Sequence, residues 1–219
     1  MLGAEARRYL ETVLRLAPGA RIEVFDGRGG RYDASIEAGF EAVRLGPRQE
    51  APPAGVELAL VAALAKGERM ELVVQKATEL GVARILPFAA ERSVVRLDVA
   101  RGDDRAARWR RIAEQASRQC GRADVPEVRP PAPLAEALAA LPPGTRTFVF
   151  HPGGGRVEGP GAASVAAVVG PEGGLTEGEV RGCEAVGAVR AGLGPRTLRA
   201  ETAAIVAVTL LQARFGDLG

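Results

Sequence analysis

The stretch that decides the fold runs from Val168 to Val180 and reads VVGPEGGLTEGEV. An apolar run leads into a glycine-rich turn and then into a helix start, the order found at many nucleotide-binding loops. The stretch lacks the Lys-Ser/Thr end of a phosphate loop and the glycine spacing of a dinucleotide fingerprint. Thr176 and Glu179 have the spacing of a capping box, which predicts a structural role at the helix start. The sequence therefore indicates a strand, a loop and a helix that hold something other than a phosphate.

Three apolar segments in the last third of the chain each end in a loop of glycine and proline. We call them loop 1 (Phe150–Gly153), loop 2 (Gly170–Gly174) and loop 3 (Leu193–Arg199). Ligands of open α/β sheets bind beyond the carboxyl ends of the strands, so we expect the three loops to converge there. Glycine lets a backbone approach a ligand closely. Backbone groups can read the edge of an adenine without a charged side chain, which suits a nucleoside whose reactive group is a cation.

Strand and helix patterns alternate from Val56 onward. The expected elements are strands at 57–63, 82–86, 147–150 and 164–169, and helices at 68–80, 105–120 and 134–141. Strands this apolar favour a parallel sheet covered on both faces. Short strands at 20–25, 31–36 and 40–45, after an amphipathic helix that ends near Leu16, predict a small barrel or sheet. A proline-rich linker at 51–55 divides the chain into a β domain at 1–55 and an α/β domain at 56–219.

Composition narrows the class of protein. The chain has 219 residues, of which 47% are hydrophobic and 26% charged, as in soluble globular proteins. No apolar run is long enough to span a membrane, and charges near the N-terminus exclude a signal peptide, so we expect a cytoplasmic protein without a membrane partner. Cys120 and Cys183 stand alone, so neither a disulfide framework nor a metal site is expected.

Positive charge is supplied almost entirely by arginine. Only Lys66 and Lys76 of the 29 basic residues are lysine, while the net charge is only +2. A GC-rich genome explains most of this usage. Arginine is also the better bidentate phosphate ligand, so an RNA partner remains open.

The last segment combines a polar start with an apolar body. After Thr202 it is apolar on all sides, which predicts a helix buried partly against another subunit. Arg199, Glu201 and Thr202 cluster where the chain leaves loop 3 and enters this helix. Capping accounts for part of this cluster, and we take the three residues as catalytic candidates.

The closing motifs VVGPEGGLTEGEV and LGPRTLRAETAAIVAVTLLQARFGDLG (193–219) together resemble the closing signature of the RsmE family. These are 16S rRNA uridine-N3 methyltransferases of the SPOUT superfamily. The resemblance extends to LAKGERMELVVQKATELGVARILPF (64–88), ERSVVR (91–96), RQCGRADVPEV (118–128) and VLRLAPGARIEVFDGRGGRYDA (13–34). It covers nearly the whole chain.

The resemblance implies a fold, a cofactor and a substrate. It implies an α/β SPOUT domain with a deep trefoil knot, preceded by a small PUA-like β-barrel domain that binds RNA, in a homodimer. S-adenosylmethionine would sit in the knot, and the substrate would be a uridine in the decoding region of 16S rRNA within the assembled 30S subunit. The implied cofactor-binding residues are those of the three loops: Phe150, His151, Pro152, Val169, Gly170, Pro171, Glu172, Gly173, Gly174, Leu193, Gly194, Pro195, Thr197, Leu198 and Arg199.

Individual roles follow from the chemistry of uridine N3, which must leave its base pair and lose a proton before it attacks a methyl group. Arg199 would hold a uracil carbonyl, the developing anion or an adjacent phosphate. Glu201 would orient Arg199 or accept the proton, and orienting is favoured because a carboxylate beside arginine is a poor base. Arg28, Arg122 and Arg196 are the RNA-binding candidates.

Two loop residues have open or secondary roles. Glu172 is either a turn carboxylate that meets water or neighbouring N–H groups, or a group that shapes the pocket or faces a positive ligand. His151 is the sole histidine of the chain and is expected at the cofactor edge rather than as a base.

The N-terminus departs from the family pattern, because Ala6 or a neighbour stands where the family often has a histidine before VLRL. Either the β domain is N-terminally incomplete or its barrel lacks a strand. Three rival functions also stay open: a ribose or guanine methyltransferase of the same superfamily, an RNA-binding or assembly factor without catalysis, and a nucleotide-phosphate binder. The first is disfavoured by the paired closing motifs and the second by the three intact loops. The third is disfavoured because the phosphate-loop lysine is missing.

Overall fold

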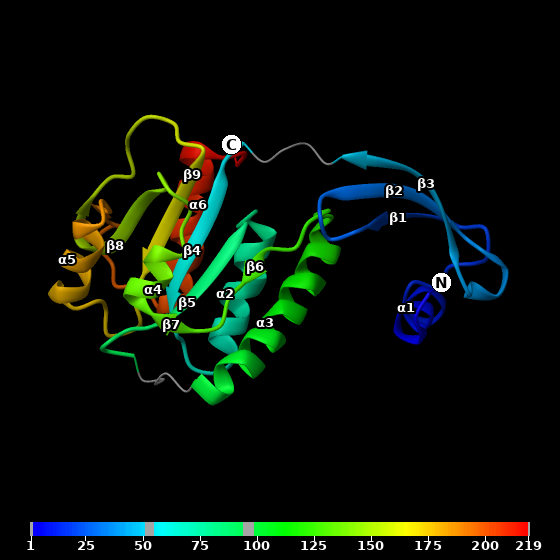
Figure 1. The fold of residues 1–219 in the computed structure, drawn as a ribbon, viewed down its shortest axis with the longest axis horizontal. Coiled ribbons are helices and arrows are strands. Elements are labelled where there is room, and N and C mark those ends of the chain that lie inside the picture. Colours follow the sequence, from blue (N-terminus) through cyan, green and yellow to red (C-terminus); the bar gives the residue numbers. More distant parts are fainter. Residues whose placement is uncertain (1, 51–54, 94–98, 219) are drawn as a thin grey trace. The chain divides into compact units, whose positions relative to one another are not determined.

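The structure, a computed structural model, describes residues 2–50, 55–93 and 99–218. The chain forms two compact units (Figure 1). Unit 1 comprises Met1–Pro52 and Gly121–Asp124, and unit 2 comprises Pro53–Cys120 and Val125–Gly219. The linker expected at 51–55 lies largely outside the described residues, so the predicted domain boundary stays a prediction.

Unit 1 is built on a three-stranded antiparallel sheet rather than on a closed barrel in its described residues. The strands are β1 (Arg21–Phe25), β2 (Gly30–Ile36) and β3 (Val43–Glu50), in that order across the sheet. Three short helical segments accompany them: α1 (Ala4–Arg8), the π-helical η1 (Tyr9–Val13) and the 3-10 turn η2 (Ala38–Phe40). Leu10, Ile36 and Phe40 form the small core between these elements.

Two element boundaries in unit 1 differ from the prediction because of backbone conformation. The third strand was expected from residue 40, but Gly39 and Phe40 adopt φ values of 78° and 55°, which close a turn, so the strand begins at Val43. The first helix was expected to reach Leu16, but it ends at Val13, and Arg15 has a φ of 52°. Positive φ is incompatible with continued helix or strand.

Residues 121–124 bind the β1–β2 turn of unit 1. The Gly29 N–H donates to the Ala123 carbonyl at 3.1 Å, and the Arg31 guanidinium donates to the Gly121 carbonyl at 3.2 Å. The Asp26 carboxylate accepts the backbone N–H groups of Arg28 and Gly30, and these bonds hold the pKa of Asp26 below its ordinary value. The turn that carries Arg28 is therefore fixed from two sides.

Unit 2 contains a seven-stranded sheet in which every pairing is parallel, as the apolar strands predicted. Its strands are β4 (Glu57–Ala63), β5 (Arg84–Ala89), β6 (Glu127–Val128), β7 (Ala132–Pro133), β8 (Arg146–Gly155), β9 (Ser164–Val169) and β10 (Val189–Ala191). The order across the sheet is β10-β8-β9-β4-β5-β6, and β7 also pairs with β5.

Helices cover both faces of this sheet (Figure 1). They are α2 (Glu68–Glu79), α3 (Val99–Cys120), α4 (Leu134–Ala139), α5 (Glu177–Ala185) and α6 (Ala200–Phe215). Successive residues of β4 alternate between the two faces: Leu60 packs in a core shared with α2, α3 and α6, and Val61 packs in a second core shared with α4 and α5. Within the described residues, none of the helices has the length and apolar character needed to cross a membrane.

Strand β8 runs further than the sequence predicted. The expected strand ended at Phe150, but β8 continues to Gly155 because the chain pairs again with β10 after an interruption. Arg190 pairs with Val149 and the next residue, Ala191, pairs with Gly155, so residues 150–154 bulge out of the ladder. Loop 1 is therefore a bulge within a strand and not the end of one.

The bulge brings two stretches of backbone into close approach. The Gly192 N–H donates to the Gly155 carbonyl at 2.8 Å. A Cβ on Gly154 would lie 2.2 Å from the Ala191 carbonyl carbon, and a Cβ on Gly192 would lie 2.5 Å from the Gly154 carbonyl oxygen. Only glycine fits at either position, because the obstructing atoms belong to backbone.

We predict that Gly154→Ala strongly destabilises unit 2, while Gly155→Ala does not. A Cβ at Gly155 meets nothing within 4 Å. Overpacking against backbone costs about 3 kcal/mol, which corresponds to a fall of about 10 °C in the apparent Tm of a chain of this size. Thermal unfolding of both variants tests the close approach, and equal Tm values for the two would show that the backbones are not in contact.

Candidate functional site

A pocket of about 310 Å³ lies where loops 1, 2 and 3 converge beyond the carboxyl ends of the strands. We call it the loop pocket. Its lining includes all the predicted cofactor-binding residues except Arg199. The sequence analysis missed Leu175, Ala200 and Ala203, which also line it, and assigned Arg196 to RNA alone. Ala200 and Ala203 lie three residues apart on α6, and this helical spacing was the available signal.

The three loops reach the pocket by different means. Loop 1 is the bulge in β8. Loop 2 makes a tight turn in which the Gly174 N–H donates to the Pro171 carbonyl at 2.8 Å, and Gly174 has a φ of 71°. Loop 3 follows the close approach at Gly192 and turns at Gly194, where φ is 90°. Each turn requires glycine, which leaves backbone rather than side chains facing the pocket.

Backbone and apolar groups dominate the chemistry of the loop pocket. Glu172, Arg196, His151 and Thr197 have the polar side chains among its described lining residues, and no lysine lines it. The described residues contain no group of three or more His, Cys, Asp or Glu side chains able to hold a metal ion. Burial raises the pKa of the nearby α5 thiol, Cys183, to about 11, which keeps it protonated. The pocket therefore suits a ligand that backbone reads, without metal coordination by these side chains.

Loop 2 is braced from outside by residues that the sequence analysis did not single out. The Arg69 guanidinium lies 2.6 Å from the Glu172 carboxylate, and the Arg92 guanidinium donates to the Gly173 carbonyl at 3.2 Å. Glu172 therefore does not meet water alone, and its role in the pocket stays a prediction.

The capping box at the start of α5 is confirmed. The Thr176 hydroxyl accepts the Glu179 N–H at 3.2 Å, and the Glu179 carboxylate accepts the Thr176 N–H at 2.8 Å. Glu91, which follows β5, joins the box through its own N–H to Glu179 at 2.9 Å and through its carboxylate to the Thr176 hydroxyl at 3.2 Å. The end of β5 is thereby fastened to the segment behind loop 2.

His151 lies at the rim of the loop pocket beside a chain of charges. Its Nε2 atom is 3.9 Å from the Glu177 carboxylate, which also pairs with Arg190. Hydrogen bonds to Glu184 and the charges of both carboxylates raise the pKa of Arg190. His151 lines the pocket, and its role at the cofactor edge stays a prediction.

The three catalytic candidates do not line the pocket, but they neighbour Leu198, Ala200 and Ala203 in sequence, which do, and they face different surroundings. Arg199 and Thr202 are exposed at the start of α6, and Arg199 makes no side-chain cap. Glu201 is only 8% exposed, and its Oε2 atom has no hydrogen-bond partner among the described residues. The part of the chain that the structure describes shows no bond between Arg199 and Glu201, so the orienting role stays a prediction.

The three RNA-binding candidates differ in solvent exposure and in ion pairing. Arg196 is exposed in the lining of the loop pocket, and Arg28 is exposed at the β1–β2 turn. The Arg122 side chain is only 15% exposed and forms an ion pair with Asp124 at 2.7 Å. This pairing holds the pKa of Asp124 below its ordinary value, against the effect of burial. The role of Arg122 in RNA binding stays a prediction, and its contacts here are structural.

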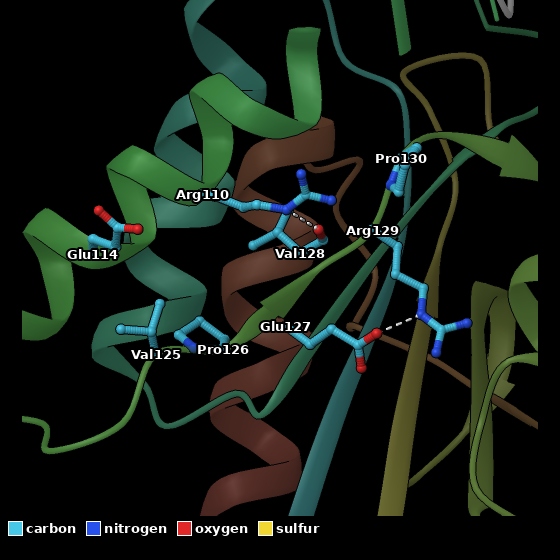
Figure 2. Close-up of a pocket in the computed structure, with 8 residues that line it drawn as sticks. All are labelled: Arg110, Glu114, Val125, Pro126, Glu127, Val128, Arg129 and Pro130. Atoms are coloured by element: carbon cyan, nitrogen blue, oxygen red, sulfur yellow. Dashed lines mark hydrogen bonds and ion pairs between the residues drawn. The ribbon is translucent and has the colours of Figure 1, made fainter. Parts of the chain in front are cut away.

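A second hollow, of about 450 Å³, lies between α3 and residues 125–130 (Figure 2). Figure 2 shows the Arg110 side chain reaching across it to the Val128 carbonyl, a bond of 2.9 Å, while Glu127 pairs with Arg129 at 2.7 Å. No predicted site residue lies here. Its arginines are already engaged, and it has none of the glycine-rich turns that open the loop pocket, which we therefore take as the functional site.

Comparison with known families gives two matches that together span most of the chain. Residues 52–212 match an RNA methyltransferase domain, and residues 2–45 match an RNA methyltransferase PUA domain. Among curated proteins, the ribosomal RNA small subunit methyltransferase E of Mycobacterium bovis is 34% identical over 91% of this chain and 80% of its own length. The Bacillus subtilis protein of the same name is 34% identical over 71% of this chain, and the aligned stretch spans 65% of that protein.

Solved structures of similar proteins share the fold over nearly the whole chain. A methyltransferase from Legionella pneumophila in complex with the cofactor SAM has a TM-score of 0.87 and 36% identity, covering 99% of this chain and 92% of its own. A ribosomal RNA small subunit methyltransferase E from Neisseria gonorrhoeae bound to S-adenosyl methionine also has a TM-score of 0.87, with 30% identity, covering 100% and 92%.

Proposed function

We propose, from the premise that this chain belongs to the RsmE family of S-adenosylmethionine-dependent rRNA methyltransferases, that it methylates N3 of a uridine in the decoding region of 16S rRNA. The observation that carries the proposal is the loop pocket, where GPEGG and the LRAETA start of α6 meet. The choice of uridine N3 rests on the resemblance of these paired motifs to the family signature. The natural place of action is the cytoplasm, where 30S subunits are assembled.

The residues of the loop pocket fit the cofactor. When bound, S-adenosylmethionine supplies an electrophilic methyl group on a positively charged sulfur. The backbone of loops 1, 2 and 3 would hold the adenosine, since Gly170, Gly173, Gly174 and Gly194 in the lining let a ligand approach the backbone closely.

Arg199 is placed to act on the uracil ring. It follows Leu198 and precedes Ala200, both of which line the pocket, and its own side chain is exposed. Negative charge develops on the uracil carbonyl oxygens as N3 loses its proton, and a guanidinium donates charge-assisted hydrogen bonds to such oxygens. Thr202 is exposed in the same first turn and can contact the ring or an adjacent phosphate.

Glu201 supplies a buried acceptor that the described residues leave unsatisfied. A carboxylate oxygen without a donor is costly inside a protein, which supports a donor that arrives from elsewhere. We assign that donor to Arg199 once the substrate is in place, and the alternative is the N3 proton itself. The burial of Glu201 keeps water from competing for this oxygen.

A second copy of the chain is proposed to cover the outer face of α6. Val206 and Ile205 are only partly buried and Leu210 is 38% exposed, although residues 203–208 of the helix are all apolar. Exposed apolar patches of this kind mark protein interfaces. We also propose that the chain forms the deep trefoil knot of its family, which the close approach of Gly154 and Gly192 supports.

Sedimentation equilibrium tests the homodimer. The expected mass is twice the 22.8 kDa of one chain. Leu210→Glu would place a charge in the apolar face and shift the protein toward single chains. A wild-type protein that sediments as a single chain at micromolar concentration would overturn the proposed dimer.

Arg199→Ala is predicted to reduce methyl transfer by about 100-fold or more, the usual effect of removing a donor to a developing oxyanion. Binding of S-adenosylmethionine, measured by calorimetry, should stay near the wild-type value because Arg199 does not line the pocket. Arg181→Ala, which removes an exposed arginine of α5, is the matched control and should keep both activities. Equal loss of binding and transfer in Arg199→Ala would contradict the assigned role.

The preferred substrate should be the assembled subunit. Purified 30S particles that lack the modification are expected to accept a labelled methyl group, free 16S rRNA only poorly, and digestion should release N3-methyluridine identified by mass spectrometry. Release of a ribose-methylated nucleoside or a methylguanine would replace the proposed reaction with that of another SPOUT enzyme. Rapid methylation of short free RNA would contradict the proposal that the enzyme requires an assembled subunit.

A further inference from the structure

Glu172 is the sole carboxylate among the described residues that line the loop pocket. Its side chain is 35% exposed, so its charge is only partly screened by water. The Arg69 guanidinium, from the first turn of α2, lies 2.6 Å from one of its oxygens. A negative charge of the pocket is thus paired with a positive charge from a segment 103 positions away in sequence.

Arg69 acts on the charge of loop 2 rather than on its path. The path is held by the turn from Gly174 to Pro171 and by Arg92, whose guanidinium binds the Gly173 carbonyl. Arg92 also packs closely, since a Cβ on Gly173 would lie 3.2 Å from the Arg92 Cβ. Within the described residues, the Arg69 guanidinium donates to the Glu172 carboxylate and to no backbone group of the loop.

The cofactor and its product differ in electric charge, which is the property that this ion pair can sense. S-adenosylmethionine carries a permanent positive charge on sulfur, and S-adenosylhomocysteine, left after methyl transfer, has a neutral thioether at the same position. A free carboxylate in the pocket lining would favour the cation, and a guanidinium at hydrogen-bond distance offsets most of that preference.

We propose that the Arg69–Glu172 ion pair balances the charge of the loop pocket and thereby sets its preference for S-adenosylmethionine over S-adenosylhomocysteine. The proposal rests on the proposed function, since it takes these two molecules as cofactor and product. Removal of Arg69 leaves the Glu172 carboxylate without its counter-charge and strengthens the preference for the cation. Removal of the Glu172 charge leaves the Arg69 guanidinium without its counter-charge and weakens that preference.

Calorimetry with the two compounds, without RNA and at low ionic strength, tests the proposal through the ratio of their Kd values. Arg69→Gln should shift the ratio about 5-fold toward S-adenosylmethionine and Glu172→Gln about 5-fold away from it, as expected for a partly exposed charge. The double variant removes one charge of each sign, so it keeps the wild-type net charge and should return to the wild-type ratio. A structural defect would not shift the Kd ratios of the two single variants in opposite directions. It would also not return the ratio of the double variant to the wild-type value.

Two further variants guard the interpretation. Lys66→Gln removes an exposed positive charge that does not line the pocket, three residues before Arg69, and should shift the ratio less than Arg69→Gln. Arg69→Lys keeps the charge and should keep the wild-type ratio, and Glu172→Gln carries the test if Arg69→Gln fails to fold in thermal unfolding. Shifts in the same direction, no shifts, or a double variant that stays displaced would overturn the proposal. A wild-type protein that binds neither compound would overturn the proposed function instead.

Discussion

Two stretches of backbone, at Gly154 and Gly192, come so close that neither can carry a Cβ atom, and the site depends on this constraint. It forces residues 150–154 out of the ladder between β8 and β10, and it directs loop 3 past that bulge toward α6. Loop 2 ends the neighbouring strand β9 at the same edge of the sheet. A parallel sheet would place any three such loops on one side, but the close approach makes them share one pocket.

The sheet was predictable where local pattern and tertiary pairing agree. Strands β4 and β9 have the expected bounds, since both are central apolar runs with turn residues at their ends. The end of β8 was missed because His151, Pro152 and the glycines after them read as a loop, and only pairing of Gly155 with Ala191 makes the strand resume. Positive φ at Phe40 displaced β3 for a similar reason, since no local rule assigns that conformation to phenylalanine.

The site was predictable to the extent that its residues are consecutive. The glycine-proline loops and the Thr176–Glu179 capping box are contiguous motifs, and the structure places them in the pocket and behind it. Arg69 and Arg92 escaped notice because their contacts to loop 2 join residues 103 and 81 positions apart. The sequence analysis also did not predict that Glu201 is buried while Arg199 is exposed. Their helical spacing could have indicated this difference, because it places the two residues on different faces of the helix. The pocket thus takes its shape from backbone and its charge from residues outside its own motifs.

A crystal structure of the protein with S-adenosylmethionine tests the central claim most directly, because the claim is that loops 1, 2 and 3 form one cofactor site. The account predicts density for the adenosine between these loops, with contacts to the backbone of Gly170–Gly174 and Leu193–Leu198. Density in the hollow beside Arg110 instead, or no density at saturating concentration, would contradict it.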